Sequence, residues 1–555
     1  MTFKKFFCFS FAIFCMNCIF SQEALKSIEE EYYDFLSLQG ITERPTLGYR
    51  TLSDSVWTLD ENTEHLWQDN NLGTTFTLWQ KQEQNQNWFL KGLNQNIKVR
   101  IYGPEWYNSY NTAAPYGQND GALWQGKGYN TSLTAGARLE AFGFELTLKP
   151  QVTFSQNLEF ETMPSSYDSE YGYFWGYGKN IGIDAPQRFG DKAFWTFDWG
   201  DSELRWSWHT FTMGFGTQSI WLGPAYLNPI LHSNNAATYP KFDLGLRKTS
   251  LYMPHFGWHL GDIEGRIWIG YLSESDYFDN DDSNNHNQIS GFTLSYNPPF
   301  IKGFTIGVNK ICLSKWGENF WKYLNPFYND NPVGSEVSGE DQKISVNINY
   351  FIEKAKLELY SEFALDDYFQ GGWIIGLLRY PYDSLIWTMG LKQVHEFNSK
   401  VKGEFILEFS NMELPRNKLA TKMGYSFDMH YQIEQGFTNK GQAIGTLLAM
   451  GGNSQLLKYK LYYPKGCGEI FIQRENPNNT YSYINLKNEN QTYKSYFNIG
   501  ISNSYYVLKN LCLSGGFVYN LIINPYYYRL SEDNTILDTG YLNNFVFSLS
   551  AKYSL

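Results

Sequence analysis

The chain has 555 residues, 18% of them Phe, Trp or Tyr, and its mean hydropathy is -0.42. So many aromatic side chains in a chain that is polar on average are typical of a protein with one apolar, aromatic surface and one water-exposed surface. The formal net charge of -12 argues against a nucleic-acid partner, which would be repelled at long range.

The first residues are typical of a secretory leader. Lys4 and Lys5 precede an apolar run of roughly 15 residues, and Ser21 is a small residue suited to a cleavage site. The run is too short and wrongly flanked for a transmembrane helix. We therefore expect residues 1–21 to be a signal peptide, whose removal takes away two lysines and leaves a net charge of -14.

Residues 22–94 differ in pattern from the rest of the chain. Apolar residues recur there at helical spacing between charged ones: Leu25, Ile28, Tyr32 and Leu36. This spacing predicts a short amphipathic helix that ends near Gly40, followed after Pro45 by an irregular stretch. We expect the region to be periplasmic and either to cover the mouth of a barrel or to enter its lumen.

From about residue 95 the apolar period changes from 3.6 to 2. The chain end is the clearest case, with one apolar face: Phe545, Phe547, Leu549, Ala551, Tyr553 and Leu555. An apolar face beside a polar one is typical of a lipid-facing strand in an outer-membrane barrel. Residues 343–365 repeat the pattern as a hairpin whose other face carries Glu358 and Glu362, which a water-filled lumen would solvate.

Short turns alternate with long polar loops along residues 95–555. We predict turns at Phe142-Gly143, Gly200-Asp201, Gly261-Asp262, Pro298-Pro299, Glu353-Lys354, Asn398-Ser399, Gly466-Cys467 and Lys509-Asn510. They give an all-β transmembrane barrel of about eighteen antiparallel strands, with periplasmic turns and outer loops. The stretch 371–383 fits this count badly. A soluble all-β protein would instead show internal repeats and mostly apolar inward faces, and the sequence has neither.

Three expected outer loops combine rings with amides: residues 107–128, 216–242 and 434–454. Flat apolar faces and planar amides are the groups that recognise sugars. The candidate polysaccharide-binding residues are Trp106, Tyr107, Asn119, Asp120, Trp124, Lys127, Trp221, Tyr226, Asn228, Asn234, Asn235 and Tyr239. The alternative is that these loops fold inward and seal the barrel, with amides and glycines satisfying their own backbones.

Three stretches carry a family resemblance: NSYNTAAPYGQNDGALWQGKG, WLGP with LNPILHSNNAATYP, and GFTNKGQAIGTLL. They resemble signature regions of the outer-membrane capsule assembly protein Wzi family, in its Bacteroidetes-type form. The resemblance implies an eighteen-stranded barrel in the cell outer membrane with a helical periplasmic part. It also implies a lectin-like role in holding exported capsular polysaccharide. The motifs do not carry the family's binding residues over individually.

Other chemistry is weakly represented. His255 and His259 lie on a segment with strand character, where a spacing of four does not place two imidazoles on one metal. Cys312, Cys467 and Cys512, outside the leader, predict neither a disulfide framework nor a zinc site. We expect no enzyme activity, cofactor or metal. The leading expectation is a surface protein that binds capsular polysaccharide or exopolysaccharide, and the alternative is a porin or channel for small or hydrophobic solutes.

Overall fold

The computed structural model describes residues 20–22, 25, 27–60, 63–82, 87–163, 171, 182–279, 281–317, 322, 325, 339–366, 378, 385–415, 426–480, 482, 493–526, 529–530, 536–537 and 540–555. Apart from residues 20 and 21, the expected signal peptide lies outside these ranges. The stretch 371–383 does so too, apart from residue 378. No helix in the described ranges is long and apolar enough to cross a membrane.

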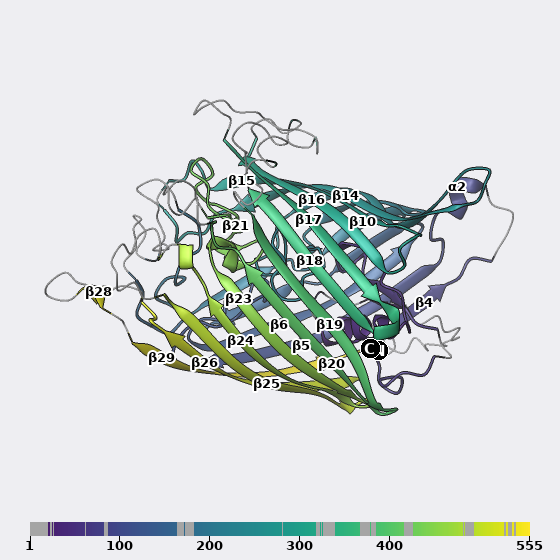
Figure 1. The fold of residues 1–555 in the computed structure, drawn as a ribbon. Coiled ribbons are helices and arrows are strands. Elements are labelled where there is room, and N and C mark those ends of the chain that lie inside the picture. The colour runs from purple at the N-terminus through teal and green to yellow at the C-terminus, as the bar shows by residue number, and fades with distance from the viewer. Residues whose placement is uncertain are drawn as a thin grey trace, which may run out of the picture.

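Antiparallel strands form one closed barrel (Figure 1). Its strands are β5 (Ile97–Asn111), β6 (Gly128–Ala141), β7 (Phe144–Leu148), β8 (Gln151–Ser155), β9 (Phe194–Asp198), β10 (Glu203–Trp208), β11 (Phe211–Gly216), β13 (Lys241–Tyr252), β14 (His259–Ser273), β15 (His286–Asn297), β16 (Phe304–Lys315), β17 (Glu340–Ile352), β18 (Leu357–Asp366), β19 (Ile386–Asn398), β20 (Val401–Asn411), β23 (Asn453–Tyr463), β24 (Gly466–Asn476), β25 (Ser495–Leu508), β26 (Leu511–Ile523) and β29 (Tyr541–Tyr553). Pairing of β29 with β5 closes the ring.

Two wall strands are interrupted midway. Both β7 and β8 pair with β6, so they are the two halves of one strand. Likewise β9 pairs with β8 and β10 with β7, which makes them the halves of the next strand. With each pair counted once, the described wall has eighteen antiparallel strands, as the sequence predicts.

Three predicted turns are misplaced although the count is right. Gly200-Asp201 lies between β9 and β10, Gly261-Asp262 lies inside β14, and Gly466-Cys467 begins β24. Gly200 and Gly261 have φ of +56° and +109°, so they mark irregularities within a strand instead of its end. The chain actually turns at residues 209–210, 253–258 and 464–465.

The wall has an apolar outer face. On β29 the side chains of Phe545, Phe547 and Leu549 are exposed, whereas Val546 between them is buried. The paired strand β26 exposes Leu513 and Ile523 in the same way. Such a band of outward apolar side chains requires lipid around it, and the fold is that of an outer-membrane β-barrel.

A segment from before the barrel completes the seam where the first and last strands meet. Strand β4 (Thr75–Trp79) pairs with the beginning of β5, whereas β29 pairs with the remainder of β5. The Thr74 amide donates to the carbonyl of Leu555 over 2.9 Å. Strand β4 therefore continues the line of the final strand.

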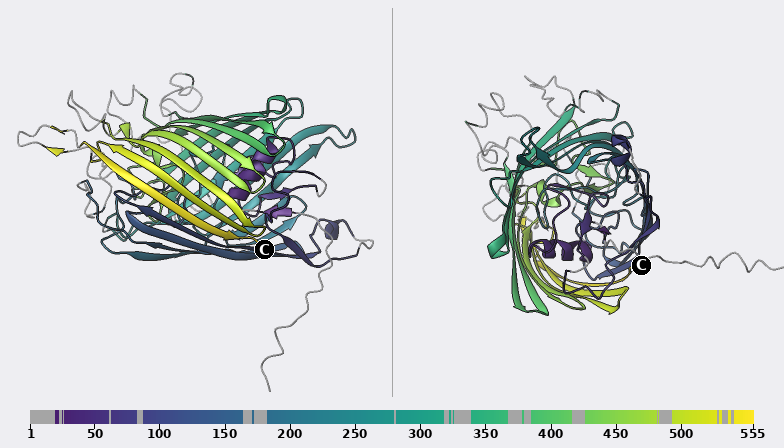
Figure 2. Two further views of the ribbon diagram at one scale, coloured as in Figure 1. Left: turned by 90° about the horizontal axis from the view of Figure 1, so that it is seen from below. Right: turned by 90° about the vertical axis from the view of Figure 1, so that its right-hand side faces the viewer.

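The remaining elements lie in the N-terminal segment and in the long loops. They are β1 (Phe20–Gln22), α1 (Ile28–Ser37), β2 (Tyr49–Arg50), β3 (Val56–Thr58), α2 (Trp88–Lys91), β12 (Trp221–Leu222), η1 (Glu353–Ala355), β21 (Thr438–Asn439), β22 (Gln442–Ala443), η2 (Leu447–Met450), β27 (Arg529–Leu530) and β28 (Ile536–Leu537). The end-on view in Figure 2 places α1 within the ring of strands.

The expectation of a water-filled lumen is wrong for the charges that suggested it. Glu358 forms a salt bridge with Arg44 of the N-terminal segment, and Glu362 accepts the Ile230 amide over 3.1 Å. Inward charges of the wall are therefore satisfied by other parts of the chain. The lumen is therefore occupied by protein, which bears on whether the barrel can act as a channel.

Candidate functional site

Four segments fill the lumen, and together we call them the plug. They are the N-terminal segment (27–72), the first loop (112–127), the lumenal loop (217–240) and the glycine-rich loop (426–452). One buried apolar cluster joins three of these segments to the wall: Tyr49, Ile220, Leu222, Ile230, Leu231, Trp268, Ile289, Phe437, Ile444 and Leu448. Burial of these side chains stabilises the plug in the way that a soluble core stabilises a domain.

Helix α1 binds the wall through an acidic face. Ser27 caps the helix by accepting the Glu30 amide over 3.1 Å. Glu29 pairs with Lys552 at 2.6 Å, and Glu31 with Lys460 at 2.7 Å. Lys460 lies on β23 and Lys552 on β29, with three strands between them, so the N-terminal helix is tied to the C-terminal part of the wall.

Asp34 extends this acidic face of α1. Its carboxylate lies 2.7 Å from both Arg44 and Lys392. Burial alone would raise the pKa of Asp34, but Arg44 and Lys392 outweigh burial and hold that pKa well below its usual range. Removing one partner of such a pair leaves a buried charge unpaired, which costs about 3–5 kcal/mol.

A wall carboxylate holds the chain that follows α1. Glu264 on β14 accepts three consecutive backbone amides, from Leu47, Gly48 and Tyr49, at 2.9, 2.7 and 3.0 Å. The extended chain at this point pairs as β2 with β12 of the lumenal loop. The N-terminal segment and the lumenal loop are thereby joined within the barrel.

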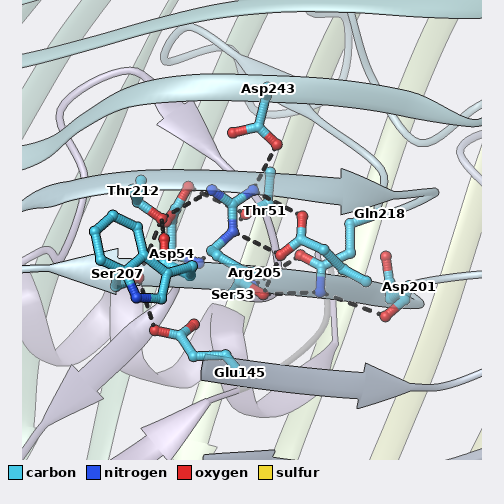
Figure 3. A network of polar contacts seen from close by, with 12 residues as sticks. Thr51, Ser53, Asp54, Glu145, Asp201, Arg205, Ser207, Thr212, Gln218 and Asp243 are labelled. Carbon is cyan, nitrogen blue, oxygen red and sulfur yellow. Dashed lines mark hydrogen bonds and ion pairs between the residues drawn. The ribbon is translucent and has the colours of Figure 1, made fainter. Parts of the chain in front are cut away.

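A network of buried charges secures the next residues of the N-terminal segment (Figure 3). Arg205 on β10 lies 2.6 Å from both Glu203 and Asp243. Arg266 on β14 joins Asp243 at 2.7 Å to Asp54 of the segment at 2.9 Å. Because each ion has hydrogen-bonded partners of opposite charge, the network fixes one position of the segment against the wall.

The same network reaches a third arginine and a polar loop residue. Arg247 lies 2.7 Å from Asp54 and 2.9 Å from Glu145. Gln218 of the lumenal loop accepts the Ser53 amide over 3.0 Å. Strands β7, β10, β13 and β14 therefore all contribute to holding residues 53 and 54.

The lumenal loop is held by a second wall carboxylate. Glu408 on β20 accepts the backbone amides of Tyr226, Leu227 and Asn228, with closest distances of 2.6, 3.1 and 2.9 Å. Glu264 and Glu408 thus use the same arrangement on two parts of the plug. Each carboxyl group thereby satisfies three backbone N–H groups of the plug.

Four of the sequence-predicted binding residues lie deep in the plug. Trp221 donates its ring N–H to the Ala225 carbonyl over 3.1 Å, and Tyr239 contacts His232 Nε2 at 2.7 Å. The Tyr226 hydroxyl donates to Glu31 over 3.0 Å, and Asn228 Oδ1 accepts from Gln118 over 2.8 Å. All four side chains are buried, so they support the loop from inside.

Four other predicted residues are half-buried and come together between the first loop and the lumenal loop. The Asn119 amide donates to Asn235 Oδ1 over 3.1 Å, and the Gly121 amide donates to the Asn234 carbonyl over 2.8 Å. Asp120 accepts from Gln125 Nε2 over 2.7 Å. Asn119 has φ of +61°, a conformation that Asn tolerates better than most residues.

Asp120 is a weaker acid than an ordinary aspartate, although its neighbours are polar. Burial raises the pKa of Asp120 to about 7, although hydrogen bonds from Gln125 and from the Gln118 backbone lower it in part. The carboxyl group therefore changes charge near neutral pH.

The last four predicted residues are divided between the plug and the wall. Tyr107 donates its hydroxyl hydrogen to Gln125 Oε1 over 3.3 Å, and Lys127 donates to the Glu159 carbonyl over 2.9 Å. Trp124 is half-buried with its ring 5.2 Å from that of Phe189. Trp106 points away from the other eleven, because it lies on the outer face of β5 with 52% of its surface exposed.

The motif around Trp124 has a packing explanation. A Cβ on Gly126 would come within 2.2 Å of the Trp124 ring, so only glycine fits beneath that ring. Gly121 and Gly128 have positive φ, at +64° and +96°. The glycines of this stretch therefore shape the first loop.

Sequence reasoning did not single out Glu264 and Glu408, which hold the plug. Their signal is present in the sequence, since each is an acidic residue on the inward face of a strand with an apolar outward face. The pattern gives the direction of the side chain but not the amides that it will meet. Among the described residues, no group of three His, Cys, Asp or Glu could hold a metal ion.

No protein-family model and no curated protein matches the chain. Among solved structures it is similar to Wzi of Escherichia coli, described as an outer-membrane protein involved in group 1 capsule assembly and as a carbohydrate-binding β-barrel. The identity is 13%, the TM-score is 0.57, and the match covers 97% of this chain and 100% of that one.

Two structures of Pseudomonas proteins match less well. OprB of Pseudomonas putida matches at 11% identity and a TM-score of 0.35, over 84% of this chain and 94% of that one. OpdQ of Pseudomonas aeruginosa matches at 10% identity and a TM-score of 0.39, over 84% and 99%. At such identities the similarity to Wzi concerns the fold alone, and the function rests on the residues.

Proposed function

We propose that this outer-membrane barrel binds exported capsular or extracellular polysaccharide at the cell surface and catalyses no reaction. The observation that carries the proposal is the joining of the first loop, the lumenal loop and the glycine-rich loop into one hydrogen-bonded unit. Long loops of such barrels face the cell exterior. A preformed polar surface there binds a flexible polymer without the loss of conformational entropy that ordering of the loops on binding would cost.

The half-buried residues are the proposed contacts. Asn119, Asp120, Asn234 and Asn235 offer amide and carboxyl groups, which bond sugar hydroxyls with defined geometry. Trp124 offers part of an aromatic face, and Lys127 offers a positive charge for an acidic polymer. The fold similarity supports this proposal because the Wzi structure is described as a carbohydrate-binding barrel.

Binding is tested with purified protein and the polysaccharide of the source cells, by calorimetry. We expect Lys127→Gln to lower the affinity for an acidic polysaccharide, most clearly at low salt, where the charge is least screened. Lys354→Gln, in an exposed turn at the other end of the barrel, is the matched control. Absence of binding to the wild-type protein, together with unchanged polysaccharide retention on cells that lack the protein, would falsify the proposal.

The alternative function, a diffusion channel, makes an opposite prediction in planar bilayers. A channel gives a large and steady open conductance. The packing of the plug against Trp268 and Ile289 of the wall favours a closed lumen. A large steady conductance of the wild-type protein would therefore favour the channel over the binding protein.

A further inference from the structure

A short arm at the short-turn rim exposes apolar side chains that the barrel wall does not need. The arm comprises residues 87–96, between β4 and β5, and contains α2. Asn87 caps α2 by accepting the Leu90 amide over 2.9 Å. The exposed fractions of Trp88, Phe89 and Leu90 are 68%, 43% and 37%, so three consecutive apolar residues face outward.

The arm is held firmly in place by backbone hydrogen bonds. The His209 amide donates to the Gly92 carbonyl over 2.7 Å, and the Gly143 amide donates to the Asn94 carbonyl over 2.9 Å. The ring N–H of Trp208 donates to the Phe89 carbonyl over 3.0 Å. The β6–β7 and β10–β11 turns therefore fix the arm to the rim.

The apolar surface of the arm is continuous with the outer face of the wall. The Trp88 ring lies 5.0 Å from that of Trp208, and the Trp79 ring of β4 lies 6.1 Å from that of Phe142. Phe142 adjoins the exposed outward residues Phe144 and Leu146 of β7. The arm thus meets the outer face of the wall at Trp208, and β4 meets it at Phe142.

We propose that residues 88–91 lie in the boundary between headgroups and acyl chains of the phospholipid leaflet at the short-turn end. In water the apolar surface of the three exposed side chains would remain hydrated, which is unfavourable. The boundary region accommodates both their apolar parts and the ring N–H of Trp88. Lys91, also exposed, reaches the headgroups with its ammonium group. The arm thereby adds a membrane contact outside the barrel wall.

Contact of the arm with lipid sets the depth of the barrel in the membrane. Most of the arm lies within residues 22–94, which the sequence predicts to be periplasmic. Residues 27–60 enter the lumen, β4 completes the seam, and the arm then turns outward to lipid. The chain before the barrel therefore first forms part of the plug, then pairs with the wall, and then meets the membrane. Its depth in the membrane is independent of polysaccharide binding.

The test places an environment-sensitive fluorophore on Trp88→Cys in the full chain, reconstituted in phospholipid vesicles. The protein is used after removal of residues 1–21, which carry Cys8, Cys15 and Cys18. The remaining cysteines, Cys312, Cys467 and Cys512, are buried, so labelling is selective for the new thiol. Lys354→Cys, in the exposed polar β17–β18 turn of the same rim, is the matched control. Quenchers are aqueous iodide and two spin-labelled phospholipids, one labelled near the headgroup and one near the chain end.

We expect the probe at position 88 to be quenched several-fold more by the headgroup-proximal lipid than by the chain-end lipid, and several-fold less by iodide than the probe at position 354. Equal iodide quenching at both positions, with no lipid quenching at 88, would place the arm in water and overturn the proposal. Stronger quenching by the chain-end lipid would overturn the boundary position. Protection from all three quenchers would assign the arm to a protein partner.

Discussion

Glu408 shows how much one wall residue contributes to the plug. Its carboxylate accepts three backbone amides of the lumenal loop, and no sequence pattern identified those donors. Periodicity correctly gives the inward direction of such residues. It gives no partner, because the partners are backbone amides 180 to 182 positions away, and any residue can supply an amide.

We expect Glu408→Gln to loosen the lumenal loop while leaving the barrel intact. The substitution removes the charge from three hydrogen bonds, two of them buried, and we expect a loss of about 2–3 kcal/mol in the local opening free energy of residues 226–228. Hydrogen exchange at these amides measures that free energy. Glu353→Gln, in an exposed turn, should leave their exchange unchanged, and equal protection in wild type and Glu408→Gln would contradict the assigned role.

Asp120 makes the first loop sensitive to pH. Its pKa is raised to about 7 by burial, so the folded loop holds a proton that the unfolded chain releases near pH 4. A carboxyl group with a raised pKa contributes stability below its unfolded pKa, and this contribution is lost as the pH rises through the folded pKa. The loop should therefore become less stable between about pH 4 and pH 7.

The measurement is the protection of amides 116–126 against hydrogen exchange, corrected for the intrinsic rate at each pH. Asp120→Asn keeps an oxygen acceptor for Gln125 and cannot ionise, so its protection should stay constant over this range. A pH dependence that persists in Asp120→Asn would assign the effect to another group.

At the scale of single elements, helix α1 is the part that the sequence predicted best. Its apolar spacing, from Leu25 to Leu36, predicts a helix that ends near Gly40, and the structure has the helix at Ile28–Ser37. Its location in the lumen follows from the positions of Lys392, Lys460 and Lys552, which lie on three different strands. In the sequence pattern, each lysine looks like any other inward-facing polar residue of a strand. The docking site of α1 therefore could not be predicted.

We expect Lys392→Ala to release α1 more than Lys356→Ala does. Lys392 forms a buried pair with Asp34, and its loss leaves that carboxylate without one of its two close cations. Lys356 pairs with Glu396 on the surface, where an ion pair contributes at most about 1 kcal/mol. Cleavage within 27–60 by an added protease measures the release. Equal cleavage of the two variants would show that the buried pair does not hold the helix.

Turns were predicted less well than strands because glycine has two uses here. At Gly143 it forms a tight turn, whereas at Gly200 and Gly261 it permits an irregularity within a wall strand. All three have positive φ, so the local conformation does not separate the cases. Only the pairing of neighbouring strands decides which glycine ends a strand.

At the scale of the whole molecule, the plug has two layers that meet within the barrel. The N-terminal segment fills it from the short-turn end, and the loops fill it from the other end. Strands β2 and β12 pair where the layers join. The sequence yielded the eighteen strands, since alternation is local, but not the filling of the lumen, which depends on contacts between distant segments.

The two layers lead to a prediction about conductance. Deletion of residues 27–58, or replacement of residues 222–238 by a short flexible linker, should each leave the bilayer conductance low, because one layer still obstructs the lumen. The two changes together should produce a steady open conductance. High conductance after either single change would mean that one layer alone closes the barrel.

The hydrogen bond from Thr74 to Leu555 makes the docking of β4 depend on the strand that closes the ring. Closing the ring brings residues 97–111 to residues 541–553 across nearly the whole sequence, and such long-range pairing is slow. Strand β4 can dock fully only after the C-terminal strand is in place. Strand β4, which precedes the barrel in the chain, is thus among the last segments to be fixed, and pulse-labelling should find residues 75–79 protected later than the β17–β18 hairpin.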